Sequence, residues 1–264
     1  LGIRMTGIDF NQSEQHLLSI RLSADGFSFS ICHPQQKGDC FFTTYPVNVS
    51  CSMTANLKEM LASTEAFRHS YRKVNILIDT PRFTTIPFDL FEDEQLETLF
   101  YHNFSRIDNE TVLCNISGKS NTVIVFGMDK HTHSLLNEHF PHARIFASVS
   151  PLVEFFAQES RTSNQKTLYA NLKRNSMDVI GLDRGKLLFM NTFNCKQVSD
   201  RVYYLLYVWQ QLGFSQENDH LRLAGADKCQ EISQEIQKFL RNVTQCSSEQ
   251  DNIPFDLKTL FICE

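Results

Sequence analysis

The sequence predicts an α/β protein of two similar lobes, in which mixed sheets are flanked by helices. One observation is a strand pattern that occurs twice, at residues 17–31 and again at residues 168–190. Each copy has an apolar strand, a short polar turn and a strand of alternating apolar residues, followed by another strand and an amphipathic helix. A second observation is the 42% hydrophobic content with 22 Phe, which is ample for a sizeable core, either as one large domain or as two lobes.

The first half begins with a predicted antiparallel meander. Asp25-Gly26 is a tight-turn signal between its first two strands. A helix is expected next, because Leu57, Met60 and Leu61 lie on one helical face. The predicted strands of this half cover residues 17–22, 27–32, 40–47, 74–79, 111–116, 122–126 and 144–147, and its helices cover 54–69, 91–104, 129–140 and 150–158.

The second half restarts after residues 159–166 (ESRTSNQK), the most polar stretch between apolar elements. We place the lobe boundary there, with a first lobe over residues 1–160 and a second over 161–264. Gly213 is expected to end the long helix of this half. The predicted strands are 168–172, 177–182, 187–192 and 221–224, the helices are 197–212 and 227–240, and the apolar tail 253–263 is expected to pack back on the body.

Composition and charge exclude several classes of function. A net charge of −5 with 21% charged residues gives no basis for strong nucleic-acid binding, which depends on clustered Lys and Arg. No apolar run approaches the roughly 18 residues of a membrane span. The first residues show no charged segment followed by an apolar one, so no signal peptide is expected. We therefore expect a cytoplasmic protein without membrane insertion.

Eight cysteines are scattered through the chain without a C-x-x-C pair. An even number is compatible with disulfides, but a chain of this length has a core of its own, and we favour buried free thiols in a reducing compartment. Cys195, between a strand and the long helix, is the least implausible nucleophile, although a buried structural thiol is the favoured interpretation. The cysteines are Cys32, Cys40, Cys51, Cys114, Cys195, Cys229, Cys246 and Cys263.

The turns of the repeated unit carry a family resemblance. They read Arg21-Leu22-Ser23 in the first half and NLKRNSMD at residues 171–178 in the second, and Gly225-Ala226 follows a later strand. With this element order, the second half resembles the second lobe of the actin-like ATPase superfamily, which includes actin, heat-shock chaperone ATPases and sugar kinases; this implies a two-lobed, ribonuclease H-like fold. Its style is closest to bacterial pilus-assembly and cell-division members. The whole chain resembles an uncharacterised family of Bacteroidetes proteins, a domain of unknown function with that fold.

The resemblance implies a nucleotide site whose main residues are replaced. The superfamily has Asp-x-Gly at the first turn, where Asp acts near Mg²⁺ and Gly lets backbone amides approach phosphate, and Arg21-Leu22-Ser23 stands there. Its second-lobe pattern, Asp-x-Gly-Gly-Gly-Thr-Thr-Asp, keeps only Ser176 and Asp178. Lys173 and Arg174 place long side chains where phosphates would lie, and the adenosine-side Gly-Gly becomes Gly225-Ala226.

These replacements predict the loss of Mg-ATP hydrolysis. Mg²⁺ needs hard oxygen ligands, and Arg21 in place of Asp changes the local charge by two units, each worth about 4 kcal/mol at an effective dielectric near 20. The chain has no Gly-Gly pair that could form another phosphate loop. We expect no cofactor and no metal, and we favour a non-catalytic binding or scaffold module with a protein partner, a homodimer being an option.

Two alternatives stay open. One is a nucleotide-dependent, ATPase- or kinase-like enzyme with an altered site, in which Asp178 or Asp79 is the carboxylate; capping of the turn Thr80-Pro81 is the other role for Asp79. The second is a metal-free anion site where basic side chains converge from both lobes, against the plain interpretation of solvated turn residues. The candidate cleft or anion positions are Arg21, Ser23, Lys173, Arg174, Ser176, Asp178 and Gly225.

Two further groups of residues invite a functional interpretation. His131, His133, His139 and His142 surround one predicted helix, but their spacing does not converge as a zinc site requires, and we expect surface histidines. Among the many aromatic residues most are expected in the core. Tyr203 and Tyr207, four apart on the long helix, are the better candidates for contact with a partner.

Overall fold

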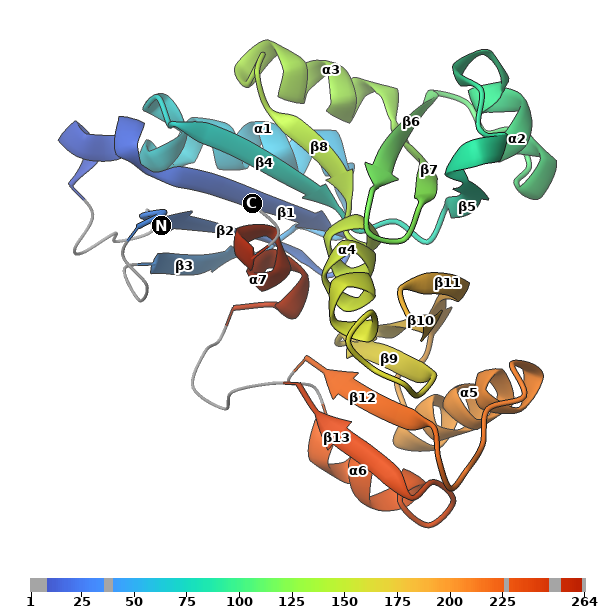
Figure 1. Ribbon diagram of the computed structural model, residues 1–264. Coiled ribbons are helices and arrows are strands. Elements are labelled where there is room, and N and C mark those ends of the chain that lie inside the picture. Colours follow the sequence, from blue (N-terminus) through green and yellow to red (C-terminus); the bar gives the residue numbers. More distant parts are fainter. Residues whose placement is uncertain (1–8, 36–39, 226–227, 247–252, 263–264) are drawn as a thin grey trace. The chain divides into compact units, whose positions relative to one another are not determined.

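The computed structural model describes residues 9–35, 40–225, 228–246 and 253–262 and confirms an α/β architecture of mixed sheets flanked by helices (Figure 1). The chain forms two compact units. Unit 1 takes the described residues of 1–84, 94–114 and 125–148, and unit 2 those of 85–93, 115–124 and 149–264. The predicted lobes, 1–160 and 161–264, are contiguous in the chain whereas these units are not, so the boundary near residue 160 stays a prediction.

Unit 1 contains a five-stranded sheet in the order β3-β2-β1-β4-β8. The first three strands are antiparallel neighbours, and β4 and β8 add in parallel. Alternation along the strands gives the sheet one apolar face, with Ile20, Phe29 and Ile76 in register and fully buried. The strands are β1 (Leu17–Ser23), β2 (Gly26–Cys32), β3 (Cys40–Tyr45), β4 (Lys73–Ile78) and β8 (Arg144–Ala147).

Helices of unit 1 cover the apolar face of this sheet. Phe29 packs edge-on against Phe67, whose ring lies 6.2 Å from that of Phe140 at the end of α3. The predicted helix over 54–69 is shorter than expected, because a 3₁₀ turn, η2 (Glu65–Arg68), replaces its last part after Thr64. The helices are α1 (Met53–Ser63), α2 (Leu96–Asn103) and α3 (Lys130–His139), and a 3₁₀ turn, η1 (Phe10–Gln15), precedes β1.

Unit 2 repeats the same sheet, in the order β11-β10-β9-β12-β13. The directions of the strands also repeat, since β9, β10 and β11 are antiparallel neighbours and β12 and β13 add in parallel. The equal order confirms that one unit of structure occurs twice. The strands are β9 (Thr167–Leu172), β10 (Ser176–Asp183), β11 (Lys186–Asn194), β12 (His220–Ala224) and β13 (Asn242–Gln245).

Helices lie on both faces of the second sheet (Figure 1). On one face α5 (Val198–Gln211) and α6 (Cys229–Ile236) share a core with β9, β10 and β12. On the other, Phe156 of α4 (Val149–Ser160) stacks on Tyr169 of β9 at 4.2 Å. The same Phe156 ring stacks on Phe255 of α7 (Phe255–Ile262), which brings the C-terminal helix against α4.

A third, three-stranded sheet has the order β5-β7-β6. Its strands are β5 (Phe83–Pro87), β6 (Glu110–Ser117) and β7 (Thr122–Asp129). Two short 3₁₀ turns, η3 (Phe88–Leu90) and η4 (Asp93–Gln95), lie between β5 and α2. The strand β5 was not predicted, because its five residues include Pro87 and follow Pro81, and prolines weaken a strand pattern. Among the described residues, none of the helices has both the length and the apolar composition that a membrane crossing requires.

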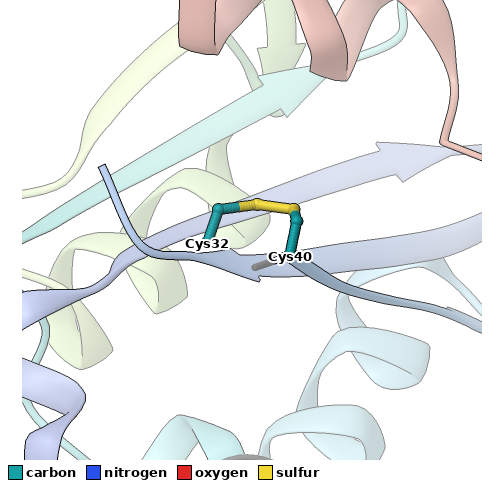
Figure 2. The surroundings of a disulfide bond; sticks show 2 residues. All are labelled: Cys32 and Cys40. Carbon is teal, nitrogen blue, oxygen red and sulfur yellow. A yellow bond between two sulfur atoms is a disulfide. The ribbon is translucent and has the colours of Figure 1, made fainter. Parts of the chain in front are cut away.

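The expectation of free thiols is wrong for Cys32 and Cys40, which form a disulfide (Figure 2). The two residues face each other directly across the β2–β3 pair, and their Cα atoms are 4.1 Å apart. Register alone brings them together, and the register of a hairpin is not visible in cysteine spacing. Among the described cysteines, those at positions 51, 195, 229 and 246 are free, as expected.

Candidate functional site

The two strand–turn–strand hairpins place the candidate residues at equivalent positions in the two units. In unit 1, Arg21 of β1 lies opposite Ser28 of β2. In unit 2, Asn171 of β9 lies opposite Asp178 of β10, and the same number of residues separates the members of each pair. The hairpins can therefore be compared residue by residue, with Ser23 at the position of Lys173.

In unit 1, the Arg21 side chain is bound to a carboxylate of its own chain. Arg21 Nη2 lies 2.7 Å from Asp79 Oδ2, and the two side chains are only 11% and 13% exposed. The hydroxyl of Ser23 donates to the same oxygen at 3.0 Å, and Ser148 donates to Oδ1 at 3.2 Å. Asp79 follows β4 and Ser148 follows β8, so the carboxyl ends of parallel strands bring these groups together.

In unit 2, a fully buried carboxylate takes the corresponding role. Asp178 is 0% exposed, and Lys173 Nζ lies 2.8 Å from its Oδ1. Thr192 Oγ1 donates to Oδ1 at 2.8 Å, and Asn171 Nδ2 donates to Oδ2 at 3.0 Å. These donors come from β9, the turn and β11. Both oxygens of Asp178 are therefore engaged by neighbouring strands of the same sheet.

Arg201 of α5 completes this arrangement, and sequence reasoning missed it. Its side chain is fully buried, and Nη2 donates to the carbonyl oxygens of Lys173 at 2.6 Å and Arg174 at 3.1 Å. Nη2 also lies 3.4 Å from the Cys195 oxygen. The guanidinium thus holds the β9–β10 turn against the helix. A usable signal was present, because Arg201 stands three residues after Val198, within the apolar stripe of the helix.

The other candidate positions are structural or exposed. Arg174 is exposed and forms no ion pair with the residues that the structure describes. Ser176 accepts the Lys173 amide through its carbonyl at 3.0 Å. Gly225 has φ +86°, and a Cβ there would collide with the Leu172 carbonyl, so strand packing alone requires glycine.

The structure brings together Arg21 with Ser23 in unit 1, and Lys173 with Ser176 and Asp178 in unit 2. Arg21 and Ser23 belong to one unit and the other candidates to the other. Convergence of the basic side chains from both halves therefore stays a prediction.

The residues present do not fit the Mg²⁺-nucleotide that the fold family implies. Mg²⁺ is held through carboxylates and waters in near-octahedral geometry. Here the carboxylate in each hairpin region is already bound by an ammonium or guanidinium group and by hydroxyl or amide donors. Across the described ranges, no group of three or more His, Cys, Asp and Glu side chains is arranged to hold a metal ion.

Cys195 lies in the same region as a buried thiol. It is 3% exposed, and burial raises the pKa of its thiol, an effect that Arg201 partly offsets. A raised pKa keeps sulfur protonated, which is unfavourable for a nucleophile. Of the histidines, His139 Nε2 lies 3.1 Å from the Phe67 carbonyl, and burial lowers the pKa of His133.

Tyr203 and Tyr207 stand on the exposed face of α5. They are 63% and 49% exposed, and their rings stack at 6.2 Å with planes 17° apart. Tyr204, between them, packs on Phe193 of β11 and anchors the pair to the core. Tyr203 and Tyr207 therefore form an exposed apolar patch of two stacked rings, here called the tyrosine patch.

Comparisons with known proteins agree with this fold. A crystal structure of a Bacteroides thetaiotaomicron VPI-5482 protein, described as having an actin-like ATPase fold and unknown function, is 45% identical, with a TM-score of 0.87 over 97% of this chain and 99% of that chain. The PilM-PilN type IV pilus biogenesis complex matches with a TM-score of 0.55 at 11% identity, over 94% of this chain and 97% of that chain, which supports the fold alone. No curated protein matches the sequence significantly.

The family comparison covers most of the chain. Residues 6–243 match the family described as protein of unknown function (DUF3822). Together with the high similarity to the Bacteroides structure, this confirms the resemblance inferred from the hairpin turns. The chain belongs to the DUF3822 family and has the actin-like ATPase fold.

Proposed function

We propose that this chain is a non-catalytic protein of actin-like ATPase fold that binds a protein partner as a scaffold. The observation that carries the proposal is the Lys173–Asp178 pair, with the carboxylate 0% exposed and Nζ at 2.8 Å. The Arg21–Asp79 pair in the other unit supports it. In both hairpin regions a fixed side-chain cation neutralises the carboxylate.

The physical argument is one of competition. A metal ion at Asp178 would have to displace Lys173, whose charge would then repel it by about 4 kcal/mol per unit charge at 4 Å and an effective dielectric near 20. Breaking a buried ion pair costs about 3–5 kcal/mol, because one charge is left uncompensated. Arg201 holds the carbonyls of the same turn, so the turn cannot easily move aside. These terms oppose Mg²⁺-dependent nucleotide binding.

The sharpest test is calorimetric titration with ATP, with and without Mg²⁺, together with a phosphate-release assay. We expect no magnesium-dependent binding and no turnover. Lys173→Ala is the informative variant, because it releases Asp178, and we expect it to gain weak divalent-ion binding. Arg174→Ala, at an exposed residue of the same turn, is the matched control and should leave the titration unchanged.

Two outcomes would overturn the proposal in favour of the alternatives. Turnover with Mg²⁺ in the wild-type chain would make this an enzyme, with Asp178 or Asp79 as its carboxylate. Nucleotide binding independent of metal, and lost in Arg21→Ala with Lys173→Ala, would instead establish an anion site formed by these basic side chains.

We propose that the protein partner contacts the tyrosine patch formed by Tyr203 and Tyr207. The similarity to a structure of the PilM-PilN complex gives a protein–protein precedent for the fold, and the stacked, exposed rings are suited to contact another protein. Affinity purification should capture a partner with the wild-type chain and lose it with Tyr203→Ser and Tyr207→Ser together. Phe239→Ser, at another exposed ring of unit 2, is the control. Equal capture by all variants would contradict this assignment.

We also propose that the protein works in the cytoplasm. The described cysteines at positions 51, 195, 229 and 246 are free, which is typical of a reducing compartment. Alkylation of thiols in intact cells, followed by mass spectrometry, tests this. We expect alkylation at Cys51, which is exposed and free, and a Cys51 that is oxidised in every molecule would argue for an oxidising location.

A further inference from the structure

Strand β3 (Cys40–Tyr45) is an edge strand without charge. It reads CFFTTY, and the chain has no Asp, Glu, Lys or Arg between positions 40 and 57. Within the part of the chain that the structure describes, β3 pairs with β2 alone and ends the sheet. Aromatic and β-branched residues on an edge favour pairing with another strand.

The other sheet edges carry features that discourage pairing. β11, the corresponding edge of unit 2, begins with the exposed Lys186, and its ladder with β10 shifts register at Gly181 and Leu182. β8 and β13 are only four residues long. In the third sheet, β5 ends in Pro87 and β6 begins with Glu110. Charge, proline, irregularity and short length are the devices by which proteins protect edges, and β3 has none of them.

The register shows which backbone groups of β3 are available. In antiparallel pairs the Cα atoms of non-hydrogen-bonded residues are about 4.5 Å apart and those of hydrogen-bonded residues about 5.5 Å. Cys32 and Cys40, at 4.1 Å, are therefore a non-hydrogen-bonded pair. By alternation, Phe41 and Thr43 bond to β2, while the amides and carbonyls of Cys40, Phe42 and Thr44 point to the open edge.

The edge is also held in place before any partner arrives. The Cys32–Cys40 disulfide joins the first residue of β3 to the last residue of β2 (Figure 2). At its other end Tyr45 lies opposite Phe27 in the ladder. A strand already ordered loses little entropy when another strand adds to it.

We propose that β3 pairs with β3 of a second copy of this chain, antiparallel and about a two-fold axis at Phe42. In this register Phe42 lies opposite Phe42 of the second copy, and Cys40 lies opposite Thr44 in both directions. Each outward amide of these residues then donates to an outward carbonyl of the other copy. Each such pair exchanges two hydrogen bonds. A two-fold interface places identical residues near each other, and like charges would oppose it, so an uncharged strand is suited to self-pairing.

The strand alone sets a modest affinity. Stable interfaces bury about 1,200–2,000 Å² in total, more than a six-residue edge provides. Apolar residues that follow β3 in the chain can add to the buried area, among them Val49, which is 90% exposed. We therefore expect a reversible dimer with a dissociation constant of about 1–100 μM, since area and ordering costs together limit affinity.

The test is sedimentation equilibrium of the full chain across roughly that concentration range. Thr44→Pro removes an outward amide while sparing the bonds to β2. Two hydrogen bonds are lost in the dimer, so we expect dimerisation to weaken about thirtyfold, equal to about 2 kcal/mol at 1.4 kcal/mol per factor of ten. Phe42→Lys, which opposes two ammonium groups on the axis, is the second variant and should weaken it comparably.

Asn191→Lys supplies the matched control, since it adds the same charge to the corresponding edge strand of unit 2. It should leave the dissociation constant unchanged. Thermal unfolding of each variant checks that the fold is kept. A wild-type chain that stays monomeric throughout would overturn the proposal, as would a dimer that both β3 variants leave unaffected. Either result is independent of the nucleotide titrations, which read the hairpin turns and not this edge.

Discussion

The two halves of the molecule build the same five-stranded sheet but start their helices differently. In unit 1, the Ser52 side chain caps α1 by accepting the Ala55 amide at 3.1 Å, and Asp129 caps α3 by accepting the Thr132 amide at 2.7 Å. In unit 2, the residues before α5 and α6, Gln197 and Lys228, make no side-chain capping bond. The two sheets therefore have the same topology although their helices differ in side-chain capping. The N-termini of α5 and α6 need stabilisation other than a side-chain cap.

A buried polar side chain in the first turn of α1 and of α5 shows how the two helix starts differ. It stands four residues after the N-cap position in both helices. Asn56 of α1 is buried and donates to the carbonyl oxygens of Asn48, Cys51 and Ser52, all within the loop that enters its own helix. Arg201 of α5 is buried at the same position, and its longer side chain reaches beyond the entering loop to the β9–β10 turn. Arg201 thus ties the hairpin turn of unit 2 to α5, whereas the Asn56 side chain donates only within the loop that enters α1.

Among the substitutions that compare the two units, Arg201→Met should lower the free energy of unfolding most. It removes charge-assisted hydrogen bonds and leaves buried carbonyls unsatisfied, which we expect to cost about 3–4 kcal/mol. Asn56→Ala, which affects only a local loop, should cost about 2 kcal/mol. Urea unfolding followed by circular dichroism measures both.

Arg184→Met is the control for Arg201, because Arg184 is 72% exposed and its removal should change the free energy of unfolding by less than about 0.5 kcal/mol. If Arg201→Met and Asn56→Ala cost the same, the longer reach of the guanidinium adds nothing, and the contrast between the halves is wrong.

Next in size is the difference between the two carboxylates. Asp178→Ala strands the Lys173 ammonium, which is 10% exposed, and should cost about 3 kcal/mol or more. Asp79→Ala strands Arg21 beside a site that water reaches more easily, since Asp79 is 13% exposed and Asp178 0% exposed, so about 2 kcal/mol is expected.

Thermal denaturation of the two carboxylate variants, each beside its Asp→Asn counterpart, gives the measurement. The asparagine variants keep the shape and an acceptor oxygen, so they should recover part of the loss. A larger cost at Asp79 than at Asp178 would contradict the expectation that the more deeply buried carboxylate contributes more to stability.

Some elements of the fold were predictable from the sequence and others were not. The α/β class was predicted correctly because the repeated pattern at 17–31 and 168–190 follows strand and helix periods, which depend on local burial. β13 was missed because its four residues, NVTQ, contain a single apolar side chain, which gives no periodic pattern. The Cys32–Cys40 bond was missed because register is a tertiary property.

The candidate site was predictable in its location but not in its bonding. The hairpin turns drew attention to Arg21, Lys173 and Asp178, yet their partners come from distant positions, as Asp79 and Thr192 show. Helical periodicity treats Arg201 as a break in the apolar stripe, and only the fold reveals the carbonyls that surround it. Whether the basic residues of the two halves share one ligand stays a prediction.

The stability contributed by the Asp129 cap of α3 should depend on pH, by about 1 kcal/mol, and α6 of unit 2 has no such side-chain cap. Hydrogen bonds from Thr132 and Thr54 outweigh desolvation by burial and lower the pKa of Asp129 below its usual 3.8. A lowered carboxyl pKa stabilises the fold above the unfolded value, and this contribution is lost as pH falls through the folded value. Asp129→Ala should therefore cost about 1 kcal/mol at pH 7 and progressively less below about pH 4.

Urea titrations of the wild-type chain and of Asp129→Ala at pH 7, 5 and 3 test this. The two free energies of unfolding should approach each other at the lowest pH. A gap that stays constant down to pH 3 would mean that the ionised carboxylate is not what caps α3.

The smallest expected effect is a gain, produced by giving unit 2 the signal that it lacks. Gln197 precedes α5 with φ −87° and ψ 149°, the extended backbone of an N-cap, but supplies no side-chain bond. Gln197→Ser should let a hydroxyl accept an amide of the first turn, as Ser52 does in α1, and stabilise the chain by about 0.5–1 kcal/mol. Ser52→Ala is the reciprocal variant and should lose a similar amount. If Gln197→Ser gives nothing while Ser52→Ala is costly, Arg201 already fixes the start of α5, and the two halves differ in mechanism rather than in degree.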